Sequence, residues 1–78
     1  MITGCQLCAT ILGMEFTCFV AGRTVKVIAT HVWLEQNLGA YECAAWERSI
    51  RSKHAIVFEA VRSSAGFSKG DELILLVK

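Results

Sequence analysis

Apolar and polar residues alternate over two neighbouring stretches in the first half of the chain, at residues 14–20 and 25–29. A period of two is typical of half-buried strands. Ala21-Gly22 lies between the stretches and is a connection of the kind that closes a hairpin. We therefore expect an antiparallel hairpin. One of its faces is not cleanly polar, because Phe19 and Ile28 lie among its polar residues.

The next segment has the end signals of a short helix. Thr30 is a suitable N-cap for a helix over residues 31–38, and Gly39 is suited to the position that ends it. The expected apolar side of this helix consists of Val32, Trp33, Leu34 and Leu38.

A longer helix is predicted from residue 40 or 41 to Ser64, ending before Gly66. Its apolar positions recur every three or four residues, which defines one buried stripe. We expect Trp46 and Val57 to lie between this helix and the sheet, with Glu47 and Arg51 paired on the exposed side. The stripe comprises Cys43, Trp46, Ile50, His54, Val57 and Val61.

The chain continues with a turn at residues 68–71 and an apolar stretch over residues 72–78. A strand that is apolar on both faces is expected at the centre of a sheet, or covered on both sides. The element order is then β-β-α-α-β in a single α+β domain over residues 1–78, with residues 1–12 as an N-terminal arm or an extra strand. We expect three or four mainly antiparallel strands with both helices packed on one face.

Composition adds an expectation about assembly. Of the 78 residues 54% are apolar and only 19% are charged, against a typical value of about 25%. A chain this short buries only about 60–65% of its unfolded surface, so we expect a homo-oligomer, most simply a two-fold dimer. The outward residues of the last strand, either Leu73, Leu75 and Val77 or Ile74 and Leu76, also need cover. Alternatively, the N-terminal segment folds over the exposed sheet face and the monomer is complete. The interface candidates are Phe19, Ile28, Leu73, Leu75 and Val77.

The charge balance narrows the expected partners. The formal net charge is +1, which creates no strong field for nucleic acid or an anionic membrane. No apolar run approaches the roughly 18–20 residues of a membrane span. We expect a soluble, cytoplasmic protein with a protein partner or a small apolar ligand.

The opening residues Ile2-Thr3-Gly4-Cys5 resemble a lipoprotein cleavage box, and Cys5 and Cys8 are spaced like half a zinc site or a redox pair. A lipoprotein box needs a basic and then an apolar segment before the cysteine, and neither precedes Cys5. A zinc site needs a second pair of ligands, which Cys18, Cys43 or His31 would supply only through the fold. We expect free thiols and no metal.

Candidate catalytic residues are few. His54 lies on the expected apolar stripe, where a core or interface histidine is commoner than a catalytic one. His31 is expected to be exposed, and no Ser-His-Asp or Cys-His set has a supporting motif. We expect no enzyme and no cofactor.

The residues therefore favour a non-catalytic, homo-oligomeric binding or adaptor module. The alternative is a nucleic-acid-associated accessory protein that contacts phosphates through Arg48, Arg51 and Arg62, which are expected to share one face of the long helix. Near-neutral charge favours the first interpretation.

The stretch MEFTCFVAGRTVKVIATHVWLEQNLGA, with WERSI and VFEAVR after it, resembles a bacterial family known as domain-of-unknown-function family 1488. The matching positions are Gly22-Arg23, Thr30, Leu34-Glu35 and Gly39, within residues 14–62. Val32 or Trp33 stands where family members carry an acidic residue after the cap, so no capping box is expected. The resemblance implies a fold and an assembly but no known activity.

Overall fold

The computed structural model describes residues 1–77 and contains one four-stranded sheet with four helices. The predicted α+β class is confirmed, and the sheet has the strand order β1-β2-β3-β4. The strands are β1 (Ile2–Leu7), β2 (Gly13–Val20), β3 (Arg23–Thr30) and β4 (Leu73–Leu76). The helices are α1 (His31–Leu38), α2 (Cys43–Ser52), α3 (His54–Ser63) and α4 (Ala65–Lys69).

The first three strands form an antiparallel meander. The predicted hairpin is confirmed: Val20 pairs with Arg23 across a two-residue turn, in which Ala21 and Gly22 have φ angles of 51° and 76°. Two positive φ angles give a turn of the type whose twist matches that of the flanking strands. Of the alternatives for the N-terminal residues, the extra strand is the one observed, because β1 pairs with β2.

The position of the last strand differs from the prediction. β4 lies at the sheet edge and runs parallel to β3, with Lys26 opposite Leu73 and Ala29 opposite Leu76. The expectation of a central strand, or one covered on both faces, is wrong, because Leu73 remains 47% exposed. The strand β4 therefore has one apolar face that is buried in the core and one apolar face that is exposed.

Helix α1 begins and ends as predicted. The Thr30 side chain accepts a hydrogen bond from the backbone N–H of Trp33, at 3.3 Å. Gly39 has a φ of 66° and donates its N–H to the carbonyl of Glu35 at 3.1 Å. Glycine occupies this left-handed conformation without the steric cost of a side chain.

The predicted long helix is interrupted at Lys53, so two helices stand where we expected one. Lys53 has φ −111° and ψ 38°, and its Nζ donates to the carbonyl of Leu38 at the end of α1, at 2.7 Å. The His54 ring donates from Nδ1 to the Arg51 carbonyl at 3.1 Å. In an unbroken helix that carbonyl would accept from the backbone N–H of Ala55. The imidazole therefore replaces a missing backbone donor.

The segment predicted as a turn at residues 68–71 contains the last two residues of a short helix, α4, and Gly70, which ends that helix. Ser64 caps this helix by accepting a hydrogen bond from the N–H of Phe67 at 3.2 Å. The guanidinium of Arg23 lies 4.1 Å from the centroid of the Phe67 ring and donates to the carbonyls of Phe67 and Asp71. Arg23 thereby attaches α4 to the β2–β3 hairpin.

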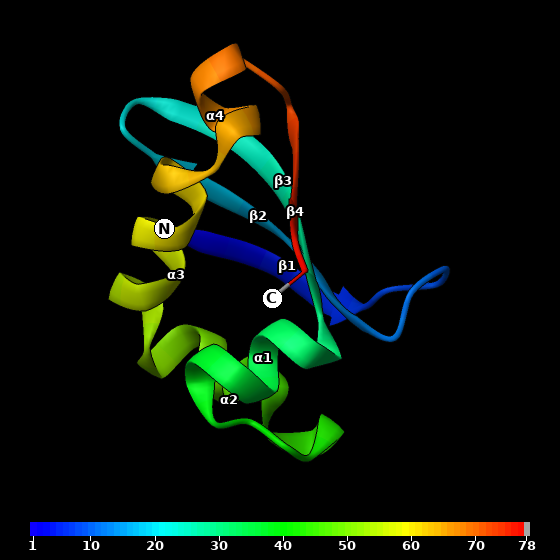
Figure 1. The fold of residues 1–78 in the computed structure, drawn as a ribbon. Helices are drawn as coiled ribbons and strands as arrows, with labels where there is room; N and C mark the ends of the chain where they lie inside the picture. The colour runs from blue at the N-terminus through cyan, green and yellow to red at the C-terminus, as the bar shows by residue number, and fades with distance from the viewer. Residues whose placement is uncertain (78) are drawn as a thin grey trace.

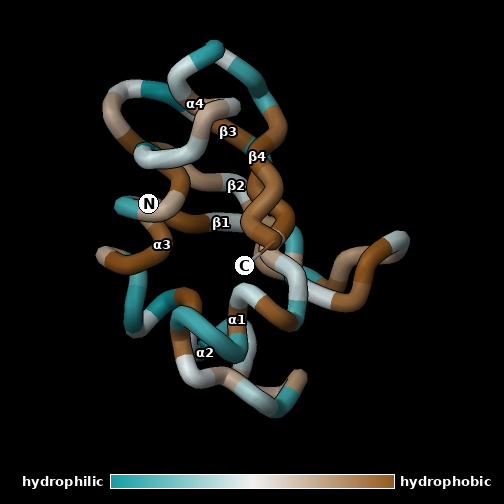
Figure 2. Tube along the Cα trace, in the orientation of Figure 1, coloured by the Kyte–Doolittle hydropathy of each residue, from teal (hydrophilic) through white to brown (hydrophobic). Residues whose placement is uncertain are grey.

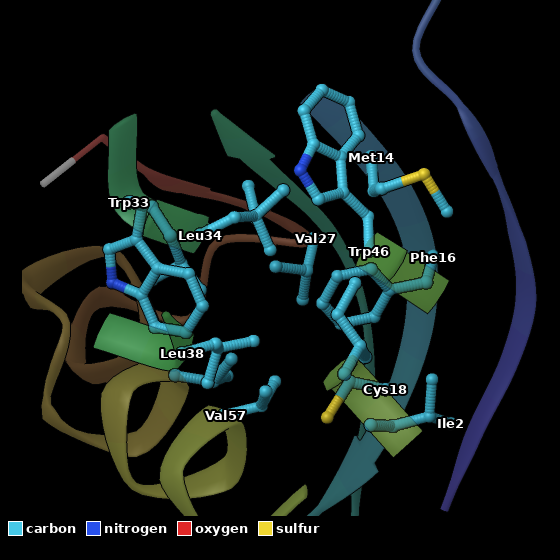
Figure 3. Close-up of a cluster of buried hydrophobic side chains, with 14 of the residues drawn as sticks. Ile2, Met14, Phe16, Cys18, Val27, Trp33, Leu34, Leu38, Trp46 and Val57 are labelled. Carbon is cyan, nitrogen blue, oxygen red and sulfur yellow. The ribbon is translucent and has the colours of Figure 1, made fainter. Parts of the chain in front are cut away.

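All four helices pack against one side of the sheet, and the core fills the space between (Figures 1 and 3). Trp46 and Val57 are buried there as predicted, and Trp46 Nε1 donates to the Ala40 carbonyl at 3.1 Å. Two members of the predicted stripe, Cys43 and His54, are exposed instead. The core includes Ile2, Met14, Phe16, Cys18, Val25, Val27, Trp33, Leu34, Leu38, Trp46, Ile50, Val57, Val61, Ile74 and Leu76.

Candidate functional site

The side of the sheet that faces away from the helices, here called the outer face, carries alternate residues of every strand. In β2 and β3, residues with buried side chains alternate with half-buried or exposed ones, and β4 continues the pattern. No helix among the described residues covers this face (Figure 1). The outer face comprises Thr3, Gln6, Glu15, Thr17, Phe19, Thr24, Lys26, Ile28, Leu73 and Leu75, with Val77 just beyond β4.

Four of the five predicted interface residues form one cluster on this face. Ile28 pairs with Leu75 across the β3–β4 ladder, and Leu73 and Val77 lie two residues to either side of Leu75. Leu75 is 52% exposed and Val77 is 55% exposed, whereas Ile28 is half-buried. These four residues are called the apolar cluster below. The strand β4 is brown along its length in Figure 2, in agreement with this composition.

Phe19, the fifth candidate, lies apart from the apolar cluster. It is 53% exposed and pairs with Thr24, one step beyond the Thr17–Lys26 pair towards the β2–β3 turn. Polar side chains on β2 and β3 therefore separate the Phe19 ring from Leu73. The structure brings four candidates together and leaves Phe19 at the far end of the same face.

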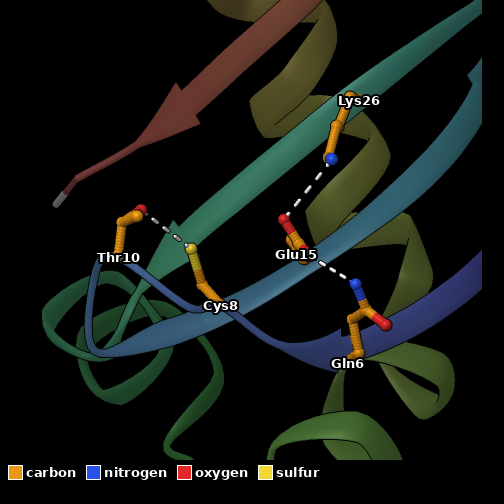
Figure 4. Close-up of polar contacts among 5 residues, drawn as sticks. All are labelled: Gln6, Cys8, Thr10, Glu15 and Lys26. Atoms are coloured by element: carbon orange, nitrogen blue, oxygen red, sulfur yellow. Dashed lines mark hydrogen bonds and ion pairs between the residues drawn. The ribbon is translucent and has the colours of Figure 1, made fainter.

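The other half of the outer face is polar. The Glu15 carboxylate accepts a hydrogen bond from Gln6 Nε2 and pairs with Lys26 Nζ at 3.5 Å (Figure 4). The hydrogen bond from Gln6 lowers the pKa of Glu15 below its ordinary value. Burial opposes this shift, and the charge of Lys26 adds a smaller lowering. The face therefore carries charges of both signs beside an apolar cluster.

Sequence reasoning missed a second exposed apolar feature, the loop of residues 8–12 with its flanking Leu7. The loop projects from the sheet at the end of β1, and much of it is apolar (Figures 1 and 2). Leu7 is 59% exposed and Leu12 is 64% exposed. The His31 N–H donates to the Leu12 carbonyl at 2.9 Å, and Thr30 Oγ1 donates to the Val77 carbonyl at 3.2 Å. The base of the loop thus lies at the same end of the sheet as Val77, and the absence of charge from Leu7 to Met14 was the signal available.

All four cysteines are free thiols in different environments. Burial raises the pKa of the Cys18 thiol, and burial is also the main effect that raises the pKa of Cys5. Hydrogen bonds from Thr10 and then Ile11 lower the pKa of Cys8 (Figure 4). Within residues 1–77, no three side chains of His, Cys, Asp or Glu gather as metal ligands would.

The three arginines proposed as phosphate contacts do not share one helix face. Arg48 and Arg51 lie on α2, while Arg62 lies on α3 beyond the break. Arg62 forms an ion pair with Glu59 at 2.8 Å, and Arg51 forms one with Glu47 at 3.1 Å. The predicted arginine face is therefore divided, and two of its three cations have carboxylate partners.

None of the helices within residues 1–77 is both long enough and apolar enough to cross a membrane. Comparison with protein-family models found no match, and comparisons with curated proteins and with solved structures found none either. The resemblance to domain-of-unknown-function family 1488 stays a prediction.

Proposed function

We propose that the protein is a homodimeric, non-catalytic binding module in which two copies pack their outer faces together. The observation that carries the proposal is the apolar cluster, Ile28, Leu73, Leu75 and Val77, on a sheet face that none of the helices α1 to α4 covers. Contiguous exposed apolar residues on a sheet typically mark a contact surface. The two histidines considered as catalytic candidates, His31 and His54, lie on different helices, α1 and α3.

The charges on the outer face favour a second copy as the occupant. A two-fold interface brings the same surface together from both copies, so an attractive surface must complement itself. Glu15 and Lys26 supply one charge of each sign beside the apolar cluster. A rotation that places Glu15 of one copy near Lys26 of the other gives attraction at both symmetry-related positions. A nucleic acid or an anionic membrane would be repelled by Glu15 and attracted only by an already paired Lys26.

The size of the outer face is compatible with a dimer at the lower end of the stable range. The strands contain four to eight residues each. At about 3.4 Å per residue and 4.8 Å between strands, the face covers roughly 400 Å² before side-chain relief is added. Together with the apolar loop at residues 8–12, it approaches the roughly 600 Å² per partner of the smaller specific interfaces. The helical side of each copy then stays open for a protein partner or a ligand.

The oligomeric state tests this proposal directly. Light scattering at micromolar concentration is expected to give twice the chain mass of 8.6 kDa. Leu75→Glu places a charge in the apolar cluster and should yield a folded monomer, because an unpaired charge in a buried interface is costly. Ile56→Glu is the matched control: Ile56 is 44% exposed on α3, on the opposite side of the sheet. It should leave the dimer intact.

Two results would contradict the proposal. A wild-type mass near 8.6 kDa at these concentrations would show a monomer. A dimer that persists in Leu75→Glu, with the circular dichroism spectrum of the wild type, would place the interface on another surface. Loss of the dimer in both Leu75→Glu and the control Ile56→Glu would also fail to assign the interface to the outer face, and would contradict the proposal.

A further inference from the structure

We propose that a pocket beside the break between α2 and α3 binds small organic anions that carry an apolar group. The pocket has a volume of about 350 Å³ and lies between the first residues of the chain and the two helices. Its lining combines one guanidinium, one imidazole and apolar side chains. The lining residues are Met1, Ile2, Arg51, His54 and Phe58.

Arg51 supplies a positive charge in a fixed orientation. Its Nη1 donates to the carbonyl of Ile2 at 3.3 Å, and its Nε donates to the carboxylate of Glu47 at 3.1 Å. Within residues 1–77, Nη2 makes no hydrogen bond. A guanidinium held on two sides is pre-organised to donate its remaining N–H groups to an incoming carboxylate.

His54 supplies a second polar atom whose position is also fixed. A backbone carbonyl can only accept, so the 3.1 Å hydrogen bond to the Arg51 carbonyl requires a hydrogen on Nδ1. The Phe58 ring packs edge-on against the imidazole, with centroids 5.5 Å apart. These two contacts orient the ring, and within the described residues 1–77 its Nε2 makes no hydrogen bond. Protonated Nε2 donates to an anion, and neutral Nε2 accepts from a ligand hydroxyl.

The remaining lining residues determine the kind of anion. Ile2 is buried and Phe58 is half-buried, so together they provide an apolar wall beside the guanidinium. An aromatic or short aliphatic monocarboxylate would place its charge at Arg51 and its hydrocarbon against Phe58. Glu47 already compensates part of the charge of Arg51, which disfavours anions of higher charge. A volume near the lower limit for ligand pockets restricts the site to small molecules.

The pocket lies on the helical side of the sheet, so it remains open in the proposed dimer but does not depend on it. It adjoins the helix break, because Arg51 lies in the last turn of α2 and His54 is the first residue of α3. The bond from His54 Nδ1 to the Arg51 carbonyl spans the break and orients the imidazole.

Nuclear magnetic resonance titration of the ¹⁵N-labelled protein with benzoate tests the site. Benzoate is expected to shift the amide signals of residues 51–58 and of Ile2, with a dissociation constant in the millimolar range. Benzamide has the same ring without the charge, and acetate has the charge without the ring. Each should bind at least about tenfold more weakly, because each loses one of the two contacts.

Variants of the two arginines of α2 distinguish binding of benzoate in this pocket from non-specific electrostatic attraction to the protein. Arg51→Gln should weaken benzoate binding at least about tenfold, since it removes a charged hydrogen-bond donor. Arg51→Lys, which keeps the charge without the planar donors, should bind with intermediate affinity. Arg48→Gln is the matched control, because Arg48 lies on the same helix outside this pocket. It should bind as the wild type does.

Several outcomes would overturn the assignment. Equal binding of benzoate and benzamide would remove the role of the charge. Equal losses in Arg48→Gln and Arg51→Gln would indicate non-specific attraction, and shifts elsewhere in the chain would indicate another site. If Arg51→Gln does not fold, the ranking of Arg51→Lys below the wild type decides the role of the guanidinium. Leu75→Glu should bind benzoate normally, so failure of the dimer and failure of this site remain distinguishable.

Discussion

His54 shows how one residue departs from an otherwise correct periodic pattern. Its spacing from Ile50 and Val57 predicts a place on the buried stripe, yet only the other two are buried. Ile50 and Val57 are seven residues apart, which returns them to the same side of the helical segment despite the break. At the break, Lys53 Nζ donates to the Leu38 carbonyl, at 2.7 Å. That contact joins residues distant in sequence, so the local pattern did not contain it.

The cysteines Cys5 and Cys8 should differ in reactivity although they are close in sequence and both half-buried. Hydrogen bonds from Thr10 lower the pKa of Cys8, while burial raises that of Cys5. The thiolate is the nucleophile, so at any pH below the ordinary thiol pKa a larger fraction of Cys8 is reactive. As pH rises, alkylation of Cys8 by iodoacetamide should therefore begin at lower pH than alkylation of Cys5.

Fragment-ion mass spectrometry after short pulses of iodoacetamide measures the two rates separately. Thr10→Val is the informative variant, because it removes the hydroxyl that contacts the Cys8 sulfur at 3.6 Å. The onset of Cys8 alkylation should move to higher pH in this variant while that of Cys5 stays in place. Identical pH profiles for the two thiols in the native protein would show that the loop does not stabilise the Cys8 thiolate.

At the scale of elements, the start of α1 is connected to the end of the sheet through Thr30. Its Oγ1 accepts from the Trp33 N–H at 3.3 Å and donates to the Val77 carbonyl at 3.2 Å. Thr30→Ala removes both bonds and should lower the free energy of unfolding by about 1–2 kcal/mol. Thr30→Ser keeps the hydroxyl and should lose much less. Urea unfolding followed by tryptophan fluorescence gives both values, and equal stability of the two variants would mean that the hydroxyl contributes little.

Elements specified by neighbouring residues were predictable, and elements specified by distant contacts were not. The hairpin turn, the cap and end of α1, and the burial of Trp46 and Val57 follow from local pattern and turn chemistry. The parallel edge position of β4 depends on pairing with β3, across about half the chain. Helix α4 is likewise held by Arg23, which precedes Phe67 by 44 residues. Residues 68–71 were predicted as a turn because Ser68-Lys69-Gly70-Asp71 has the composition of a turn. The contact with Arg23 could not be inferred from these four residues.

At the scale of the whole molecule, composition predicted that a single copy would leave apolar surface exposed. It did not predict which surface that would be. The pattern of β4 allowed either of two outward sets, and the fold places Leu73, Leu75 and Val77 outward. The choice depends on which residues meet the helices, as Ile74 does. The separation of Phe19 from the apolar cluster also follows from strand register, which a single sequence did not specify. The residues of the candidate face could therefore be predicted from the sequence, but their arrangement on that face could not.

The parallel pairing of β3 with β4 has a consequence for the order of folding. The meander of β1, β2 and β3 closes through short connections, whereas Thr30 and Val77, which join across β3 and β4, are 47 residues apart. Closing a longer loop costs more entropy, so β4 should dock last and open first. Amide hydrogen exchange should accordingly be faster in β4 than in β2, and the reverse order would refute this. Because Leu75 reaches the outer face only when β4 has docked, a copy with an unfinished sheet would lack the apolar cluster on which the proposed dimer depends.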